Sequence, residues 1–396
     1  MTASPSVAPS AAGVAAIRRL IAFPTVSRES NLELIDYVRE CLRPLDADVR
    51  LTFDNDRRKA NLFATLGPKD VRVLPGIVLS GHTDVVPVEG QAWDSDPFTV
   101  VEKDERLYGR GTSDMKSFVA LALAAAPEFV RRGLKTPIHL AFSYDEEVGC
   151  IGVGRLISDL AAAGIRPKAC IVGEPTLMQP VIAHKGKHGF RCTVSGLASH
   201  SAYAPQGVNA VEYAAEAVAF LKGMARRHRD RGPYDRSFDV AHTTVHTGQI
   251  RGGTALNIVP HECWFEFEFR HLPGDDPVAL LAEFEGYVRH LLEPEMKGVH
   301  PAAGFRIEPL SVLPVLDTGA ESEIVGLAQE LCGSHDIGKV SYGTEGSQFQ
   351  RAGIPTVVCG PGSIAQAHKP NEWVALEQIA RCEDFLSRLM DRVCVA

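Results

Sequence analysis

Apolar residues recur along the chain with two spacings, one typical of amphipathic helices and one typical of buried strands. Helical spacing covers residues 13–23 and 32–45, after which strand patterns and helix patterns begin to alternate. Strands are predicted at residues 76–84, 137–147 and 168–175, and helices at residues 113–133 and 152–164. This alternation is typical of a three-layer α/β/α fold, in which helices cover a mostly parallel sheet.

The pattern changes near His184 and returns to its first form near residue 314. Residues 263–270, CWFEFEFR, alternate between apolar and acidic side chains, which predicts a strand with one face in water. The other predicted elements of this stretch are helices at 208–228 and 278–294 and strands at 190–200, 243–253, 255–273 and 304–312. We therefore expect an α+β domain of residues 184–313, inserted into an α/β domain of residues 1–183 and 314–396.

Length and composition agree with a two-domain globular protein. The chain has 396 residues, more than a single core usually supports, with 45% hydrophobic and 23% charged residues. A net charge of −8 without a long basic run argues against nucleic acid as a partner. No apolar run approaches the length of a membrane span.

Two further features predict a cytoplasmic location. The nine cysteines are scattered and form no C-x-x-C pair, which is typical of free thiols in a reducing compartment. The start of the chain, MTASPSVAPSAAG, is small and Ser/Pro-rich, and we expect a frayed tail rather than a secretion signal.

The segment HLAFSYDEEVG ends a predicted strand with three consecutive acids, Asp145, Glu146 and Glu147. Like charges this close repel one another, and each resists burial unless a cation compensates. Either the side chains spread into water or a cation lies among them.

Potential metal ligands follow several predicted strands at the point where each strand ends. Functional groups of open parallel sheets gather outside the carboxyl ends of the strands, so these residues should converge. They are His82, Asp84, Glu146, Glu147, Glu174 and His368, with Asp114 at the start of the predicted helix 113–133. Taken singly, each has a plainer explanation as a turn, a solvated strand end, a helix-start residue or a loop histidine. Together they predict a metal centre.

The residue types indicate which metal this centre would hold. Imidazole argues against Ca²⁺ and Mg²⁺, whereas mixed nitrogen and oxygen ligands suit Zn²⁺. So many carboxylates are best used by two ions that share one of them. Two Zn²⁺ and a bridging hydroxide are balanced by three carboxylates, which leaves one residue of the pair Glu146 and Glu147 free as a general base.

Several motifs of the chain resemble those of the co-catalytic di-zinc deacylases and exopeptidases. This group includes carboxypeptidase G, aminoacylase, succinyl-diaminopimelate desuccinylase and acetylornithine deacetylase. The motifs are SGHTDVVP, GRGTSDMKS, DEEVGCIG, GEPT, GLASHSAYAPQGVNA, GGTALNIVP and GPGSIAQAHKPNE, and the similarity runs from about Ile17 onward. Within the group, GEPTLMQPVIAHKG, YGTEGSQF and GPGSIAQAHKPNE are most similar to the acetylornithine deacetylase branch.

The resemblance implies a role for each residue of the predicted centre. Asp114 would bridge two Zn²⁺, and Co²⁺ or Mn²⁺ would also suit these positions. His82 and Glu174 would complete one site, and Glu147 and His368 the other. Glu146 would then be the free base, Asp84 would orient the imidazole of His82, and the peptide bond between Asp114 and Met115 would be cis.

The resemblance also implies that the inserted domain is a lid through which the protein forms a homodimer. His200, supplied by the partner subunit, would hydrogen-bond the oxyanion, and Asn257 and Arg270 would contact the substrate carboxylate. Thr344, Glu345 and Gly362 would also bind substrate. Glu345 is expected to face the pocket and pair with the δ-amine of acetylornithine, although a solvated loop glutamate explains it equally well.

The resemblance implies hydrolysis of N2-acetyl-L-ornithine to L-ornithine and acetate, a step of arginine biosynthesis. A hydroxide bridging the two zinc ions would attack the acetyl group, with Glu146 as general base. A broader N-acyl-amino-acid deacylase, a succinyl-diaminopimelate desuccinylase and a dipeptidase are alternatives within the group. A non-catalytic binding or scaffold protein on the same fold is an alternative outside it.

Overall fold

The computed structural model describes residues 8–395, which form two compact units. The first unit contains the residues up to Ala183, Leu316–Gly338 and the residues from Thr344 onward, and the second contains His184–Val315 and Lys339–Gly343. This division differs from the predicted one in placing residues 314–315 and 339–343 in the second unit. Most of the predicted N-terminal tail, residues 1–7, lies outside the described residues. Among residues 8–395, none of the helices has both the length and the apolar character needed to cross a membrane.

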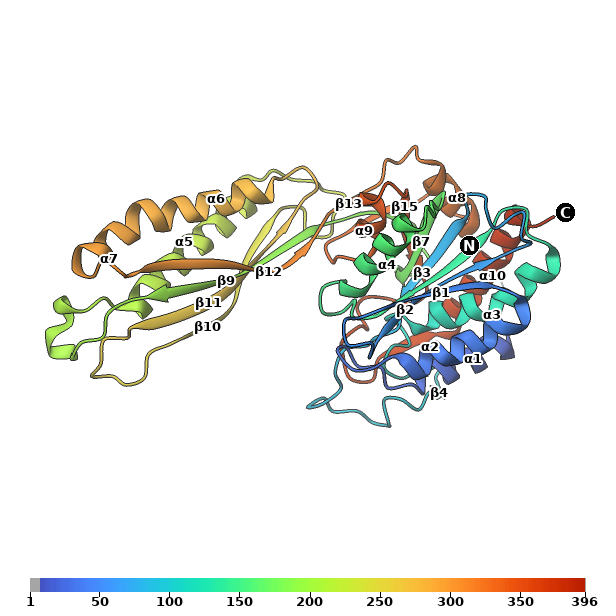
Figure 1. The fold of residues 1–396 in the computed structure, drawn as a ribbon, viewed down its shortest axis with the longest axis horizontal. Helices are drawn as coiled ribbons and strands as arrows, with labels where there is room; N and C mark the ends of the chain where they lie inside the picture. Colours follow the sequence, from blue (N-terminus) through green and yellow to red (C-terminus); the bar gives the residue numbers. More distant parts are fainter. Residues whose placement is uncertain (1–7, 396) are drawn as a thin grey trace. The chain divides into compact units, whose positions relative to one another are not determined.

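A mixed sheet forms the centre of the first unit, with the strand order β1-β2-β6-β3-β7-β15-β8-β13. Its central strands β6, β3, β7 and β15 run parallel, whereas β2 and β8 are antiparallel to their neighbours. The strands are β1 (Asp48–Phe53), β2 (Ala60–Leu66), β3 (Ile77–His82), β6 (Ile138–Ser143), β7 (Ala169–Pro175), β8 (Val181–His184), β13 (Leu316–Asp317), β14 (Gly338–Val340), which pairs with β8, and β15 (Thr356–Gly360). The prediction of an α/β fold with a mostly parallel central sheet is therefore confirmed (Figure 1).

Helices cover both faces of this sheet, with α4 and α9 on one side and α1, α2, α3 and α10 on the other (Figure 1). The helices are α1 (Ala11–Ile21), α2 (Leu32–Leu42), α3 (Lys116–Arg132), α4 (Ile151–Ala162), α8 (Glu323–Cys332), α9 (Gly346–Arg351) and α10 (Leu376–Val393), with a 3₁₀ turn at Arg43–Leu45. A small separate sheet joins β4 (Val101–Lys103), β5 (Arg106–Tyr108) and β16 (Trp373–Ala375). Because the central strands are buried on both faces, their sequences are largely apolar and do not alternate strictly.

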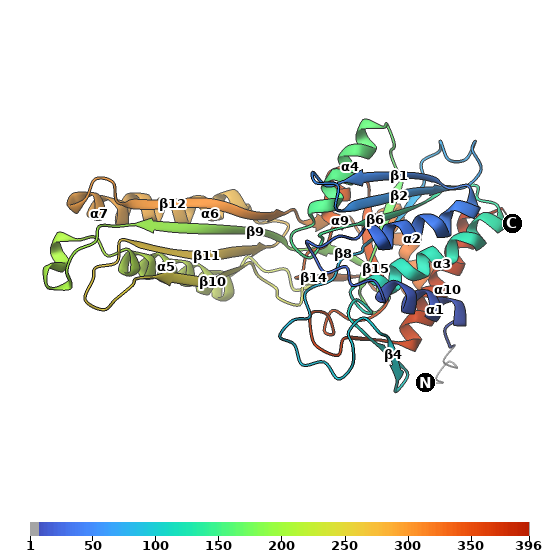
Figure 2. The ribbon, with the colours of Figure 1, turned by 60° about the horizontal axis from the view of Figure 1, so that its bottom comes forward.

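The second unit is an antiparallel sheet with the order β10-β11-β9-β12, covered on one face by helices (Figure 2). Its elements are β9 (Gly186–Ser195), a 3₁₀ turn (Ser201–Gln206), α5 (Ala210–Arg231), β10 (Thr244–Gly252), β11 (Glu262–His271), α6 (Pro277–Tyr287), a π-helical turn (Val288–Leu292), α7 (Glu293–Val299) and β12 (Gly304–Leu313). Burial alternates along β11, where Cys263, Phe265, Phe267 and Phe269 enter the core beneath the helices. The predicted sheet with one wet face is confirmed.

One local prediction was inaccurate, and one local feature was not predicted. The helix predicted from residue 113 begins at Lys116, so Asp114 precedes it and does not cap it; Met115 occupies the cap position. The hairpin of β1 and β2 was not predicted, because the short strand β1 is only partly buried and lacks a clear period. The later start of helix α3 matters for the site, because Asp114 then lies in an irregular turn.

Candidate metal centre

The sheet brings the ends of several distant segments of the first unit to one edge. His82 is the last residue of β3, Glu174 lies near the end of β7, and Glu146 and Glu147 follow β6. Asp114 lies in the turn before α3, and His368 lies in the loop after β15. Since β6, β3, β7 and β15 are parallel neighbours, their carboxyl ends share this edge, as the sequence predicts.

Asp114 lies between two imidazoles. Its Oδ1 is 3.1 Å from Nε2 of His82, and its Oδ2 is 3.3 Å from Nε2 of His368. Glu147 approaches His368 on the same side, with 2.9 Å between Oε2 and Nε2, and Glu174 lies 3.7 Å from Nε2 of His82. The five predicted ligands are therefore neighbours in the folded chain.

Two sets of these side chains are close enough to share an ion. Ligand atoms of His82, Asp114 and Glu147 lie within 4.8 Å of one another, and so do those of His82, Glu146 and Glu174. The donors are imidazole nitrogens and carboxylate oxygens, the mixture that suits Zn²⁺. The donor set therefore fits a pair of such ions. The second set contains Glu146, which the sequence predicts to remain free.

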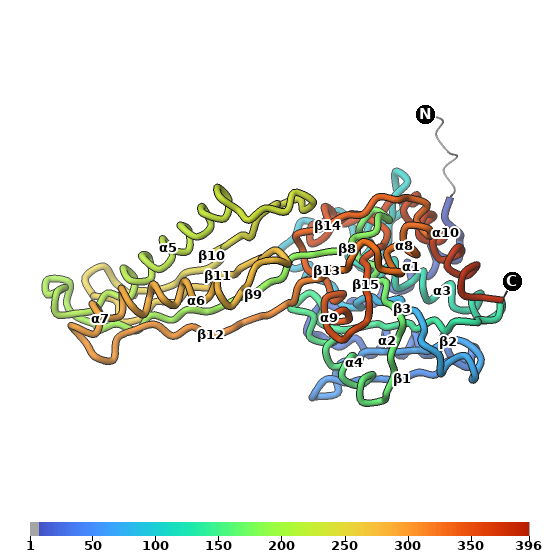
Figure 3. The backbone as a smooth tube through the Cα atoms, turned by 90° about the horizontal axis from the view of Figure 1, so that it is seen from above, coloured from blue at the N-terminus to red at the C-terminus, as the bar shows by residue number. Residues whose placement is uncertain are grey.

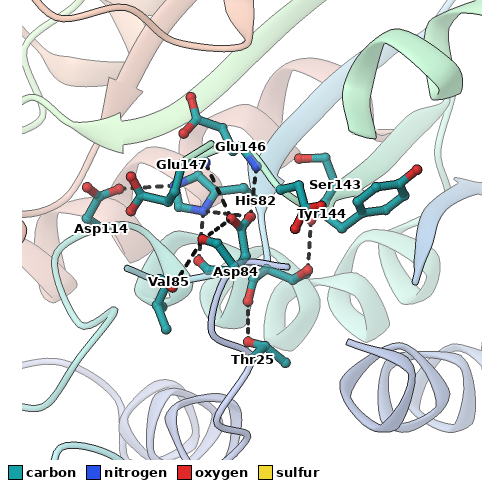
Figure 4. Close-up of polar contacts among 12 residues, drawn as sticks. Thr25, His82, Asp84, Val85, Asp114, Ser143, Tyr144, Glu146 and Glu147 are labelled. Carbon is teal, nitrogen blue, oxygen red and sulfur yellow. Dashed lines mark hydrogen bonds and ion pairs between the residues drawn. The ribbon is translucent and has the colours of Figure 1, made fainter. Parts of the chain in front are cut away.

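Asp84 contacts the site differently from the prediction (Figure 4). The imidazole Nδ1 of His82 lies 2.9 Å from the main-chain oxygen of Asp84 and 3.6 Å from its carboxylate. The carboxylate instead accepts hydrogen bonds from the amides of Glu146, at 3.0 Å, and Glu147, at 3.3 Å, and from the hydroxyl of Ser27 at 2.7 Å. Asp84 therefore orients His82 mainly through its backbone and holds the acidic turn with its side chain.

The three consecutive acids have three different environments. Asp145 is buried against cationic and amide donors, because its carboxylate pairs with Lys59 and accepts the amide of Arg28 at 2.8 Å. Glu146 accepts the thiol of Cys150 at 3.1 Å, and Glu147 faces His368. Glu146 and Glu147 therefore lie without a lysine or arginine partner in the described chain, whereas Asp145 has one.

Burial dominates the electrostatics of the glutamates. It raises the pKa of Glu146 to about 8 and that of Glu147 to about 7, with repulsion from neighbouring carboxylates adding to both. Burial, followed by the charge of Asp114, raises the pKa of Glu174 well above its ordinary value. These groups bind protons near neutral pH, so a metal ion has to compete with protons for them.

The pKa values of the two imidazoles and of Asp114 between them shift in the directions that favour the charged forms. Burial would raise the pKa of Asp114, but hydrogen bonds from His368 and His82 outweigh it and hold that pKa well below its usual range. Hydrogen bonds to Asp114 and Glu147 raise the pKa of His368 to about 10. Burial opposes the charged form of His82, but its bond to Asp114 raises its pKa well above the ordinary value. A cluster of this kind is a site for cations.

Two glycines let the chain before α3 approach the sheet closely. A Cβ at Gly173 of β7 would lie 1.9 Å from Phe118, and one at Gly81 of β3 would lie 2.7 Å from Met115. Only residues without a side chain allow this contact, which places Asp114 beside the strand ends that carry His82 and Glu174. The peptide bond between Asp114 and Met115 is cis, as the resemblance implies.

Comparisons with known proteins show which family the chain is similar to. The sequence pattern of the peptidase family M20/M25/M40 matches residues 78–392. The chain is similar to an acetylornithine deacetylase of Photorhabdus laumondii (32% identical over 387 residues, 96% of each chain) and to one of Myxococcus xanthus (35% over 384 residues, 96% of this chain and 97% of the other). Aminopeptidase PepT of Bacillus cereus has a similar fold, with a TM-score of 0.75 at 20% identity over 96% of this chain and 97% of that one.

The chain belongs to the M20/M25/M40 peptidase family. It is accordingly a metal-dependent amidohydrolase. The predicted resemblance to the deacylases and exopeptidases of this family is confirmed.

The structure differs from expectation at Glu345. This residue was expected to face the pocket or, alternatively, to be solvated, but its side chain is 0% exposed. Its carboxylate accepts the hydroxyl of Ser80 at 2.7 Å and that of Ser143 at 2.6 Å. Both serines lie on buried strands, Ser80 two residues before His82 and Ser143 three residues before Glu146. Glu345 therefore occupies the interior beneath the site. It is not placed to pair with a substrate amine.

The other predicted substrate contacts of the first unit lie in ordered loops. Thr344 is buried next to Glu345. Gly362 has a φ of +89°, a left-handed conformation that favours glycine, and its carbonyl accepts the amide of Leu177 at 2.7 Å. The loop that leads to His368 is thus tied to the segment that follows Glu174.

In the second unit, His200 and Asn257 lie together. His200 pairs with Ile258 as an isolated bridge, and the amide of Ser201 donates to the carbonyl of Asn257 at 3.0 Å. The imidazole Nδ1 of His200 accepts the amide of Ala202 at 3.1 Å, and the ring is exposed. This turn adjoins the beginning of β11.

Arg270 lies at the other end of the same strand. Its guanidinium donates to Glu268 at 2.8 Å and remains partly exposed on the wet face of the sheet. The structure therefore separates the residues that the resemblance groups around one substrate, with His200 and Asn257 at one end of β11 and Arg270 near the other.

Sequence reasoning missed Glu372, which hydrogen-bonds the turn that carries Asp114. It also missed Arg110, the buried partner of Glu372. Both residues lie inside motifs quoted above, GRGTSDMKS and GPGSIAQAHKPNE, but neither directly follows a strand of the central sheet. The available signal in the sequence was an acid, Glu372, four residues after the predicted ligand His368.

Proposed function

We propose that the protein is a di-zinc acetylornithine deacetylase, which hydrolyses N2-acetyl-L-ornithine to L-ornithine and acetate. The observation that carries the proposal is Asp114 between the imidazoles of His82 and His368, with acids on both sides. The curated relatives of that name, similar over nearly the whole chain, support the substrate. A cytoplasmic location stays a prediction.

Five residues would hold the ions. Asp114 would be shared, His82 and Glu174 would complete one site, and Glu147 and His368 the other. The ions would lower the pKa of a water molecule from about 15.7 toward about 7. Co²⁺ in place of Zn²⁺ fits the same donors.

Glu146 would supply the acid–base chemistry. As general base it takes a proton from the attacking water, and it then returns that proton to the amine nitrogen as the amide bond breaks. The carboxylate of Asp84 accepts the amide of Glu146 at 3.0 Å and so holds the main chain of the base in place.

The second unit would act as the lid and dimerisation domain. Arg270 would bind the substrate carboxylate, and His200 with Asn257 would stabilise the oxyanion and the bound substrate. From Glu262 to Arg270 the strand β11 spans about 26 Å at about 3.3 Å per residue. One small substrate held by Arg270 is out of reach of His200 in the same chain, so we infer that the two residues come from different copies of a homodimer.

Mixing two inactive variants tests this arrangement. His200→Ala and Arg270→Ala should each be nearly inactive alone, yet a 1:1 mixture that has been allowed to exchange subunits should recover about a quarter of wild-type activity, because half of the dimers then contain one intact site. The measurement is deacetylation rate after exchange, with unmixed variants as controls. Absence of recovery despite demonstrated exchange would contradict the shared site.

A substrate panel tests the reaction itself. Zinc-loaded protein should hydrolyse acetylornithine with a kcat/KM at least about tenfold above those for acetylmethionine, succinyl-diaminopimelate and a dipeptide, a discrimination of about 1.4 kcal/mol. Comparable rates on acetylornithine and acetylmethionine would favour the broader N-acyl-amino-acid deacylase. The burial of Glu345 gives that second candidate its support, because the acid expected to recognise the δ-amine lies in the interior. Preference for either of the other two substrates, or binding without turnover, would overturn both.

A further inference from the structure

A buried carboxylate holds the turn that carries Asp114. The side chain of Glu372 is 1% exposed. One of its oxygens accepts the amides of Ser113, at 2.8 Å, and Asp114, at 3.0 Å. The other accepts the amide of Gly111 at 3.0 Å and the guanidinium of Arg110 at 2.8 Å. Four donors therefore converge on one carboxylate.

The same ion pair reaches the loop of His368. Arg110, also 1% exposed, donates to the main-chain oxygen of Lys369 at 3.2 Å and to the side chain of Gln91 at 2.5 Å. The amide group of Gln91 in turn donates to the main-chain oxygen of His368 at 3.1 Å. Glu372 itself follows His368 by four residues. Gln91 thus holds the main-chain oxygen of His368, and Arg110 holds that of the next residue, Lys369.

Other bonds also hold the turn before α3, among them that of the Ser113 hydroxyl to the main chain of Ser363 at 3.1 Å. Among the described residues, however, the amides of Gly111, Ser113 and Asp114 have Glu372 as their acceptor. The turn precedes the first residue of the helix, and Gly111 has a φ of +84°. Without Glu372, three buried amides would lose their acceptor, and each unpaired amide is costly. The turn would then rearrange, and Asp114 would move with it.

We propose that Glu372 is a positioning residue for the metal centre, which fixes Asp114 and His368 relative to each other through its bonds to the turn and through Arg110. The ion that Asp114, Glu147 and His368 would hold then enters a preformed site. This inference depends on the proposed two-ion function. Glu372 touches neither substrate nor metal and acts only through other residues.

The network favours one of the two ion positions. His82 and Glu174 lie on the central strands β3 and β7, and the bonds of Glu372 and Arg110 do not include them. Loss of Glu372 should therefore weaken the ion held with His368 more than the ion held with His82. A purely structural role would lower stability without this asymmetry.

Stepwise zinc titration of metal-free Glu372→Gln against a chromophoric chelator tests the inference. Wild-type protein should bind two equivalents. In the variant the first should bind within about threefold of wild type and the second about 10–100-fold more weakly, the usual effect of losing a group that orients a metal ligand. When cobalt is added instead, the visible spectrum of the variant should match that of wild type after the first equivalent and differ from it after the second. Both affinities unchanged in a folded variant would overturn the proposal.

Glu293→Gln is the matched control. Glu293 is a buried acid of the second unit that accepts the amide of Phe305 at 3.1 Å and pairs with Arg289 and Lys297. Its loss should lower the thermal midpoint without changing either zinc affinity.

If Glu372→Gln does not fold, Gln91→Leu is the second test, because it removes the side chain that holds the main-chain oxygen of His368. This variant should bind the second zinc equivalent several-fold more weakly, and an unchanged affinity would overturn the proposal. Wild-type protein that binds fewer than two ions would instead refute the proposed function.

Discussion

Glu146→Gln is expected to lower kcat by a factor of about 10²–10⁴, the usual contribution of a general acid–base group, while both metal ions stay bound. Glutamine keeps the shape of the side chain and accepts no proton. Glu146 is the acid of the DEE run that neither Lys59 nor His368 contacts through a hydrogen bond or ion pair in the described chain. The measurements are steady-state kinetics and the metal content of the purified variant.

The neighbouring acids provide two controls. Glu147→Gln should lose metal together with activity, because Glu147 faces His368 at 2.9 Å. Asp145→Asn should keep metal and most activity and should lower stability, because Asp145 pairs with Lys59 away from the cluster. A Glu146→Gln enzyme within about tenfold of wild-type kcat would remove Glu146 from the role of base.

Removal of metal should lower activity by at least about a thousandfold, because the pKa of water then returns from about 7 toward about 15.7. It should also make stability depend on pH. Glu146 and Glu147 have pKa values of about 8 and 7 in the folded protein and 4.5 ordinarily. A raised pKa contributes stability that is complete below the ordinary value and is lost as pH rises through the folded value. Metal-free protein should therefore lose stability from about pH 5 to about pH 8.

His368 changes the stability in the same direction, because its pKa of about 10 in the folded protein lies above the ordinary 6.5. Asp114 has the opposite sign, because its lowered pKa adds stability that is lost only in strong acid. Added zinc should reverse the trend, since ligands must be deprotonated to bind it. Thermal midpoints with chelator and with zinc should separate further as pH rises from 5 to 8. A gap that stays constant or narrows would contradict the proton competition.

The strand-end ligands could be predicted from sequence because two simple rules act on them. Apolar runs reveal the buried strands, and parallel strands that end at one edge bring His82, Glu147 and Glu174 together. His368 follows the same rule through β15. The strictly alternating residues of β11 likewise revealed their wet face, because burial there has a period of two.

The remaining features depend on contacts that no local pattern encodes. Glu345 stands in a Gly-rich segment that is typical of an exposed loop, but two serine hydroxyls from other strands satisfy its carboxylate in the interior. The charge of Asp145 is compensated by Lys59, which lies 86 residues earlier in the chain. Glu372 bonds residues more than 250 positions away. Such pairings follow from the completed fold and not from spacing.

The position of β15 has a consequence for how the protein is made. This strand, Thr356–Gly360, comes after the whole inserted stretch 184–315 in the sequence and is drawn in orange-red in Figure 3. In the sheet it pairs with β7 on one side and with β8 on the other. During synthesis, this edge of β7 therefore stays unpaired until residues 356–360 have left the ribosome, and exposed strand edges invite association between nascent chains. A product that stopped before Thr356 would lack both this strand and the predicted ligand His368, and we expect it to be inactive and prone to aggregate.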